Sequence, residues 1–583
     1  MSSLASAEPW YFDDMQGKFQ ARLKGVRTET KSAMDGNFEG TSIVATLEAK
    51  FDMEVFDRLH DPTFIAIERE TSKGPINLVY EVTSVQPMHF QMLGVTSSIP
   101  QQIREEFLER VSKSWNGSQE TWIDLAAFHT GYKMFFEGNE LKFERTKLTP
   151  LQGSVAHLLS KRAVESLICV ENGMELGRVK GLDIELAVDE SSLVKYHMGV
   201  FGFTGTGKSN LTSLLVRKLM ERDSRLKVCF LDVSGEYSVN LIDKLDYCSI
   251  YSAEEFDGVD GFAQSQVIPD TLASFPGIEE RIRSRFETMN REGRLKRLAV
   301  SEQFSQVSLD SIYEVLERIS SEGKTGSLSV ENTLRSLQHY FMKKGIPSSR
   351  LLSEVDEENK NHLKTELESL KGKLHEKSGA LKDVEALLEM INNIPEGESP
   401  DIDTPETLAH KFLSGEQRML IMYLPEPYLA QQVAARFLNR LLYLKKIRGR
   451  RENVLVVLDE AQEFAAKEPK GTQTDSNRAV EALLRQGRKY GASALISTQR
   501  VAYINVNALQ QLHSYFVSTL PRVYDRMVIA DSFSLDLGVL QKTTELQTGE
   551  WLFVSYKATK QKNVPVFLTA QNNEDIVRSY LSG

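Results

Sequence analysis

The chain has 583 residues, of which 41% are hydrophobic and 26% are charged, a composition typical of soluble globular proteins. This length predicts roughly three or four domains with ample core. The formal net charge of −11 argues against a general nucleic-acid coat, but it is compatible with a local basic patch or pore.

No apolar run reaches about 18 residues, and the first residues lack the apolar core of a signal peptide. We therefore expect a cytoplasmic protein without a membrane segment. The cysteines are scattered and include no C-x-x-C pair, so we expect neither a disulfide framework nor zinc; they are Cys169, Cys229 and Cys248.

The N-terminal third predicts an extension followed by a β-domain. Residues 1–35 are polar and mixed, and we expect an N-terminal extension with a short helix around 15–23. Between 36 and 172, short β-like runs separated by turn residues predict a small barrel or sandwich, interrupted by a helix near 101–114. These runs lie at 41–48, 63–68, 76–85, 90–95 and 141–146.

A phosphate-binding motif follows. Residues 199–210 read GVFGFTGTGKSN and match G-x-x-x-x-G-K-[ST] between an apolar run and a helical pattern. Glycines let backbone N–H groups curl around a phosphate at a helix N-terminus, where a lysine and a hydroxyl reach the phosphates and Mg²⁺. We therefore expect ATP and Mg²⁺ to bind at Gly202, Thr204, Gly205, Thr206, Gly207, Lys208, Ser209 and Asn210.

From 195 onward, strand and helix patterns alternate as in a parallel α/β sheet. We expect buried strands at 228–232, 419–424, 454–458, 493–497 and 515–519. Two later runs, 549–555 and 564–568, predict strands that close the edge of the sheet. The ATPase core is thereby divided into a first part, 173–270, and a second part, 413–583.

Residues 271–412 interrupt this alternation and predict a helical insertion. Leucines and other apolar residues from Leu363 to Ile391 follow a three-and-four spacing. A helical hairpin that packs on itself or on the core is favoured over a dimerising coiled coil, because Gly372 and Gly379 weaken a long rigid rod.

Acidic and polar residues follow two of the expected core strands. Asp459 and Glu460 end the strand 454–458, so Asp459 is placed to hold Mg²⁺ and Glu460 to polarise the attacking water. Gln499 ends the strand 493–497 and is placed to sense the γ-phosphate, because strand carboxyl ends face the ligand in parallel sheets.

A basic helix end between these strands predicts an arginine finger. Arg488 or Arg485 is placed to reach a neighbouring subunit's nucleotide, although a solvated helix face would look the same. Arg500, Arg522 and Arg526 are rival candidates. The densest basic stretch, 445–451, indicates either a contact to DNA phosphates or a solvated helix end.

Together these motifs resemble the HerA-like branch of the HerA/FtsK P-loop ATPases. The resemblance rests on HMGVFGFTGTGKSN, FLDVSGEY, VLVVLDEAQEF and LLRQGRKYGASALISTQR, and it covers about 145–240 and 415–570. It implies an α/β fold with a RecA-like P-loop ATPase core, an N-terminal small β-barrel (HAS-barrel-like, matched by position) and a helical insertion.

The resemblance also implies a homohexameric ring that translocates double-stranded DNA through its centre, with ATP sites between subunits. It assigns Lys208 and Ser209 to phosphate and Mg²⁺, Asp459 to the metal, Glu460 to catalysis, Gln499 to sensing and Arg488 or Arg485 to the finger. A nuclease of the NurA type would dock on the barrel face.

This chain departs from the family in two ways. Gln462 stands where many relatives have histidine, which puts the coupling between hydrolysis and DNA in doubt. The helical insertion is larger than expected, and it points to a specialised partner such as an antiviral defence effector instead of a repair nuclease.

Two other interpretations remain open. One alternative is a nucleotide-gated scaffold ring that activates an effector without processive DNA movement, although Glu460 argues against a site that only binds. The run 413–417, LSGEQ, is similar to the signature of ABC-type DNA-repair ATPases, but it lies too far before Asp459 and runs into a β-like segment. No Asn-Lys-x-Asp follows the core, which disfavours a GTPase.

Overall fold

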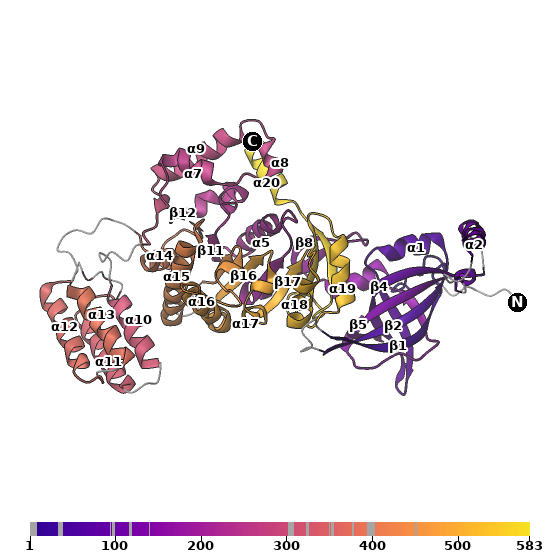
Figure 1. Ribbon diagram of the computed structural model, residues 1–583, viewed down its shortest axis with the longest axis horizontal. Helices are drawn as coiled ribbons and strands as arrows, with labels where there is room; N and C mark the ends of the chain where they lie inside the picture. Colours follow the sequence, from indigo (N-terminus) through magenta and orange to yellow (C-terminus); the bar gives the residue numbers. More distant parts are fainter. Residues whose placement is uncertain are drawn as a thin grey trace.

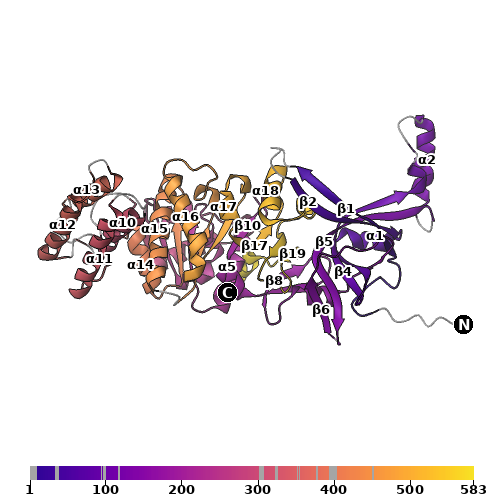
Figure 2. The ribbon, with the colours of Figure 1, turned by 90° about the horizontal axis from the view of Figure 1, so that it is seen from below.

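The computed structural model places a β-barrel at one end of an elongated molecule, an α/β core in the middle and a helical bundle at the other end (Figures 1 and 2). It describes residues 9–32, 39–93, 95, 100–115, 119–138, 140–300, 308–321, 326–348, 350, 352, 355–375, 378–392, 403–448 and 452–582. None of the helices in these ranges combines the length and apolarity needed to cross a bilayer.

Six antiparallel strands close the barrel. They follow one another in the order β2-β1-β7-β3-β4-β5, and β5 pairs back onto β2, while β6 extends β5 outside the ring. Alternate residues of β5, such as Ile123 and Leu125, are buried inside, as a closed sheet requires. The bounds are β1 Ala21–Ser32, β2 Glu39–Lys50, β3 Phe64–Thr71, β4 Gly74–His89, β5 Thr121–Glu137, β6 Glu140–Arg145 and β7 Val155–Leu158.

Two local predictions in this region were wrong. The helix expected around 15–23 is absent, since β1 begins at Ala21 and pairs with β2 along its length, so barrel structure begins before residue 36. The run 90–95 forms no strand, because only a 3-10 turn, Phe90–Met92, follows β4. The helix near 101–114 is confirmed as α2, Gln101–Lys113; α1 spans Met53–His60.

The core is built on a twelve-stranded sheet, in the order β13-β12-β14-β11-β15-β16-β10-β17-β18-β19-β8-β9. The first eight strands run parallel and the last four pair antiparallel. The bounds are β8 Met174–Val179, β9 Ile184–Val188, β10 His197–Phe201, β11 Lys227–Asp232, β12 Cys248–Ser252, β13 Leu295–Arg297, β14 Met419–Tyr423, β15 Val454–Leu458, β16 Ala492–Thr498, β17 Leu512–Val517, β18 Glu550–Ser555 and β19 Val566–Ala570.

All five predicted core strands are present, and the two C-terminal runs form β18 and β19. These two strands do not close the edge, however. The hairpin β8–β9 pairs outside β19, so a segment that precedes the phosphate loop by sequence ends the sheet on that side. Such pairing of distant segments carries no local sequence signal.

Helices cover both faces of the sheet because its strands are apolar on both sides. Phe230 of β11 belongs to the hydrophobic cluster that includes residues of α5, α7, α9 and α20, whereas the adjacent Leu231 belongs to the cluster that includes residues of α14, α15, α16 and α19. The bounds are α3 Lys161–Ile168, α4 Glu190–Lys195, α5 Lys208–Arg222, α6 Tyr237–Asn240, α7 Gly258–Ser265, α8 Asp270–Ala273, α9 Ile278–Arg291, α14 Pro405–Ser414, α15 Pro427–Arg448, α16 Gln473–Gln486, α17 Val506–Leu509, α18 Val523–Phe533, α19 Leu537–Gln541 and α20 Asn573–Ser582.

Four helices form the distal bundle: α10 Leu309–Ser321, α11 Ser327–Lys343, α12 Glu357–Lys371 and α13 Gly379–Asn392. They share a hydrophobic core of their own. The apolar residues expected to form a hairpin pack within it, which confirms the hairpin within this chain. Within the predicted insertion, however, α9, β13 and α14 belong to the core.

A candidate nucleotide site at the carboxyl edge of the sheet

The phosphate loop connects β10 to α5. Gly205 and Gly207 have positive φ angles of 81° and 92°, which side chains with a Cβ disfavour. Gly202 lies in close approach to Thr206, whose Oγ1 would be 2.5 Å from a Cβ at position 202. Glycine at these positions therefore lets the loop turn tightly into the helix.

The loop is held from the side by the turn before β18. The Gly549 N–H donates to the Thr206 carbonyl at 3.2 Å, and the Thr548 hydroxyl donates to the Gly205 carbonyl at 3.2 Å. These two bonds use carbonyl groups of the loop and engage none of its N–H groups, the kind of donor that binds an anion.

Lys208 and Ser209 begin α5, where the unpaired N–H groups and the helix dipole favour negative charge. The Lys208 ammonium lies 3.4 Å from the Phe203 carbonyl within the loop. The Asn210 side chain is turned elsewhere, because its Nδ2 donates to Asn572 at 2.6 Å and to Glu574 at 3.1 Å. Its side chain thus ties α5 to the start of α20.

Asp459 lies at the tip of β15, and two hydroxyl groups orient its carboxylate. Ser234 donates to Oδ2 at 2.6 Å and Tyr237 donates to Oδ1 at 3.3 Å. The neighbouring Asp232 accepts from the Gly235 N–H at 2.7 Å. Burial raises the pKa of both acids, and the charge of Asp459 raises the pKa of Asp232 further. Asp232, Ser234 and Tyr237 had no predicted role, although all three lie in the motif FLDVSGEY.

Glu460 follows Asp459 in the left-handed region, with φ 44° and ψ 55°. This conformation is uncommon for a residue other than glycine, and such strain concentrates at functional sites. The Glu460 Oε2 accepts from Gln462 Nε2 at 2.9 Å. Gln462 Oε1 in turn accepts from the hydroxyl of Thr498, the last residue of β16, at 2.6 Å.

Gln499 lies beside the phosphate loop. Its Oε1 accepts a hydrogen bond of 2.5 Å from the Thr204 hydroxyl. The parallel register of β10 with β16 places the carboxyl ends of the two strands side by side. The structure thus brings together Lys208, Asp459, Glu460 and Gln499 at one edge of the sheet.

The candidate arginines occupy different places. Arg485 and Arg488 precede β16 and so lie at the amino edge, opposite the phosphate loop; Arg488 stacks over Tyr196 at 5.5 Å. Arg500 follows β16 at the carboxyl edge. Arg526 is buried and donates to the carbonyls of Leu520 and Pro521, so it is a structural residue and not a finger. Arg522 is exposed.

Two further expectations are settled by burial and helix direction. Lys445 is fully buried and donates to the Glu452 carbonyl, so it neither touches DNA nor is solvated, whereas Lys446 is exposed. Residues 449–451 lie outside the described ranges. The LSGEQ run ends α14 at Ser414 instead of opening a helix, which contradicts an ABC-type signature.

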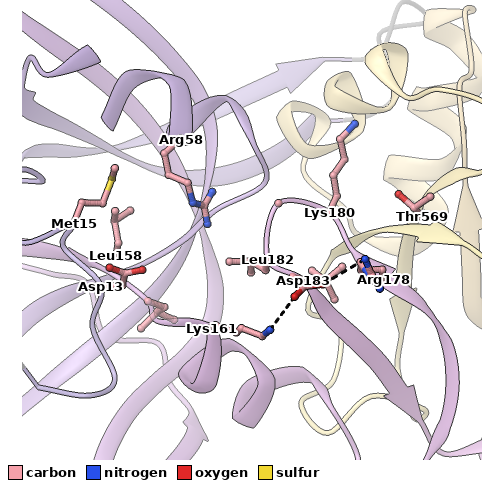
Figure 3. Close-up of a pocket in the computed structure, with 13 residues that line it drawn as sticks. Asp13, Met15, Arg58, Leu158, Lys161, Arg178, Lys180, Leu182, Asp183 and Thr569 are labelled. Atoms are coloured by element: carbon pink, nitrogen blue, oxygen red, sulfur yellow. Dashed lines mark hydrogen bonds and ion pairs between the residues drawn. The ribbon is translucent and has the colours of Figure 1, made fainter. Parts of the chain in front are cut away.

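A cavity of about 550 Å³ lies between the barrel and the β8–β9 hairpin (Figure 3). Asp183 stands between Lys161 and Arg178, at 3.5 and 3.4 Å. None of the candidate nucleotide residues lines this cavity. The barrel and core meet there, but the phosphate chemistry lies elsewhere.

The residues at the carboxyl edge fit an ATP-bound Mg²⁺ ion. Ser209 and Asp459 offer hard oxygen ligands, and Mg²⁺ commonly uses one or two such groups together with phosphate oxygens. Among the described residues, no group of three or more His, Cys, Asp or Glu side chains forms a metal site independent of nucleotide.

Residues 174–442 match the family described as "Helicase HerA, central domain". Over these residues the chain is similar to HerA helicases. It is 21% identical over 420 residues to the DNA double-strand break repair helicase HerA of Sulfurisphaera tokodaii, covering 71% of this chain and 72% of that one. Its identity with HerA of Saccharolobus solfataricus is 22% over 502 residues, 84% of each chain.

Among solved structures, VirB4 of Thermoanaerobacter pseudethanolicus is similar, with 13% identity and a TM-score of 0.37. The match covers 68% of this chain and 96% of the VirB4 chain. The order of the strands and the position of the phosphate loop establish the α/β P-loop fold of this chain independently of that similarity.

Proposed function

We propose that this HerA-like chain is an ATP-driven double-stranded DNA translocase or helicase that acts as a homohexameric ring. The observation that carries the proposal is the convergence of Lys208, Asp459, Glu460 and Gln499 at one sheet edge. Nucleotide hydrolysis requires a cation that binds the phosphates, a metal ligand, a general base and a residue that senses the γ-phosphate.

Each residue has a distinct role in this proposal. Lys208 and the loop N–H groups bind the phosphates, and Ser209 and Asp459 hold Mg²⁺, which neutralises charge on the phosphates when bound. Glu460 accepts a proton from the attacking water, and Gln499 registers the γ-phosphate. Positioning and charge neutralisation supply the catalysis, and no covalent intermediate forms.

Arg488 or Arg485 of the adjacent subunit completes the site. Their position at the amino edge keeps them from the phosphate loop of their own chain, which supports a role between subunits. The hexamer with DNA in its centre is what the resemblance to the HerA-like ATPases implies, and the similarity to DNA double-strand break repair helicases supports DNA as the substrate. A NurA-like nuclease or a defence effector would dock on the N-terminal barrel, and the complex would act in the cytoplasm in DNA end processing or antiviral defence.

The decisive experiment uses the assembled oligomer, with its mass measured in solution. Its ATP turnover is measured with and without duplex DNA, and its translocation is measured as displacement of a third strand from a DNA triplex. Wild type should turn over ATP faster with DNA and displace the third strand, whereas Glu460→Gln should bind ATP and do neither. Displacement by Glu460→Gln at the wild-type rate would refute the assignment. Negligible turnover that DNA does not change would instead favour a scaffold ring.

A further inference from the structure

Gln462 occupies the space between the proposed base and the tip of the neighbouring strand. It lies two residues after Glu460, in the short 3-10 turn Ala461–Glu463 that follows β15. Its amide donates to Glu460 Oε2 at 2.9 Å and accepts from Thr498 Oγ1 at 2.6 Å. One side chain therefore bridges the ends of β15 and β16.

The network determines which way the amide points. Thr498 Oγ1 already accepts the Arg500 backbone N–H at 2.9 Å, so its own proton is free to be donated. An ionised Glu460 carboxylate can only accept, so Gln462 Nε2 lies toward Glu460 and Oε1 lies toward Thr498, whose hydroxyl donates to it. The amide thus donates to the carboxylate, which is the partner it needs.

The far end of the relay reaches the phosphate loop. The Thr498 carbonyl accepts from the Gly202 N–H at 3.4 Å, and the adjacent Gln499 accepts from Thr204. Thr498 is fully buried, so its hydroxyl has little freedom to find other partners. The carboxylate of Glu460 is consequently tied, through Gln462, to the strand end that contacts the loop.

We propose that Gln462 is a positioning residue for ATP hydrolysis, which fixes the Glu460 carboxylate in register with the sensor strand. The proposal rests on the role of Glu460 in the proposed function. Gln462 holds one carboxylate oxygen, so the other faces the water. The amide does not titrate, so Gln462 itself keeps its donor and its acceptor at every pH at which the protein is folded.

The test compares Gln462→Leu, which deletes both hydrogen bonds, with wild type. We expect kcat to fall about 10- to 100-fold, since a correctly placed general base contributes about 10² to 10⁴. The KM for ATP and the Kd of a nonhydrolysable ATP analogue should stay within about twofold, because the phosphate loop is untouched. Gln510→Leu, an exposed glutamine outside the site, is the matched control.

A double-mutant cycle separates the relay from local packing. Thr498→Val removes the other half of the relay, so Gln462→Leu/Thr498→Val should be no slower than the slower single variant. If the loss in kcat of the double variant equals the product of the losses of the two single variants, the two residues act independently and the relay is refuted. A wild-type kcat in Gln462→Leu would refute it as well.

A variant that keeps the shape supplies a second readout. In Gln462→His a neutral imidazole can both donate and accept, but its protonation removes the acceptor for Thr498. The kcat of Gln462→His should therefore fall below about pH 6.5, beyond any fall in wild type. If kcat depends on pH in the same way in Gln462→His and in wild type, the proposal is refuted. A wild-type kcat in Glu460→Gln would instead refute the role of Glu460 as the base. If only the Gln462 variants behave unlike the expectation, the role of Glu460 in the proposed function still stands.

Discussion

The Thr204 hydroxyl in the phosphate loop donates to Oε1 of Gln499, at 2.5 Å, although 295 positions separate the two residues. The bond joins the loop that grips phosphate to the strand end proposed to sense it. In the proposed function ATP binds beside this pair, so Gln499 would exchange a protein partner for nucleotide.

Changing Gln499 to glutamate should weaken ATP binding. The variant keeps the size of the side chain but places a negative charge beside the phosphates, which costs about 1 kcal/mol or more at 4 Å even in water. The Kd for ATP should rise about fivefold or more. Thr204→Ser, which retains the hydroxyl, should bind ATP as wild type does. An unchanged Kd in Gln499→Glu, measured by fluorescence titration, would place Gln499 away from the phosphates.

Removing the Lys208 ammonium should abolish turnover. Lys208→Ala leaves the loop glycines intact but deletes the cation that reaches the phosphates, and loss of one such charge-stabilising group commonly costs about 10²- to 10³-fold. Released phosphate measures the effect, and Lys218→Ala, on the same helix, serves as a control. Turnover by Lys208→Ala near the wild-type rate would contradict the assigned site.

An arginine acting between subunits should be revealed by mixing. Lys208→Ala and Arg488→Ala chains are each expected to be inactive as pure rings, but a mixed ring contains interfaces with an intact lysine and an intact arginine. Regained turnover on mixing supports Arg488. The same experiment with Arg485→Ala and Arg500→Ala identifies the finger, and no regain with any arginine would argue against a shared site.

His197, at the start of β10, should make stability depend on pH. Its Nε2 lies 2.7 Å from the Leu484 carbonyl and its Nδ1 accepts the Ala494 N–H at 3.0 Å, so only the neutral ring satisfies both. Burial lowers the pKa of His197 to about 4. A depressed pKa means that its contribution is fully present above about pH 6.5 and is lost as the pH falls toward 4.

The size of this effect is on the order of 3 kcal/mol, from about 1.4 kcal/mol per pKa unit. His197→Gln should therefore flatten the fall in thermal midpoint between pH 6.5 and 4. Exposed His339 offers the control His339→Gln, which should leave the slope unchanged. If the thermal midpoint of His197→Gln falls between pH 6.5 and 4 as steeply as that of wild type, groups other than His197 cause the pH dependence.

The bundle should depend on a buried ion pair. Arg440 of α15 pairs with Asp310 of α10, and both side chains are almost completely buried. Arg440→Met leaves Asp310 without its charge partner, which typically costs about 3–5 kcal/mol. Hydrogen exchange in α10–α13 should accelerate, whereas Asp310→Leu/Arg440→Met should recover much of the protection. Unchanged exchange in Arg440→Met would show that hydrophobic contacts alone hold the bundle.

The phosphate site was largely readable from the sequence because its parts are local. The glycine spacing before Lys208 and the apolar run before Asp459 each encode a strand and the turn that follows it. Strands alternating with helices imply a parallel sheet, and the carboxyl ends of such strands share one edge. Proximity of Lys208 to Asp459 therefore followed without any knowledge of the strand order.

The contacts that orient these groups could not be read in the same way. Ser234 on Asp459 and Gln462 on Thr498 depend on side-chain rotamers and on which strands are neighbours. The helix predicted around 15–23 overlaps the first three residues of β1, and the rest of that strand falls in the predicted N-terminal extension, because these residues are polar and mixed. Pairing with β2 overrides this weak local preference.

The sequence by itself determined the chemistry of the nucleotide site, the α/β core and the packed helical hairpin, because spacing and periodicity are properties of neighbouring residues. Only the tertiary structure decided that β8–β9 forms the sheet edge, that α9 and α14 belong to the core, and that Glu460 is linked to the phosphate loop. These relationships join residues far apart in the chain, and burial and hydrogen bonding select them only when the whole fold is assembled.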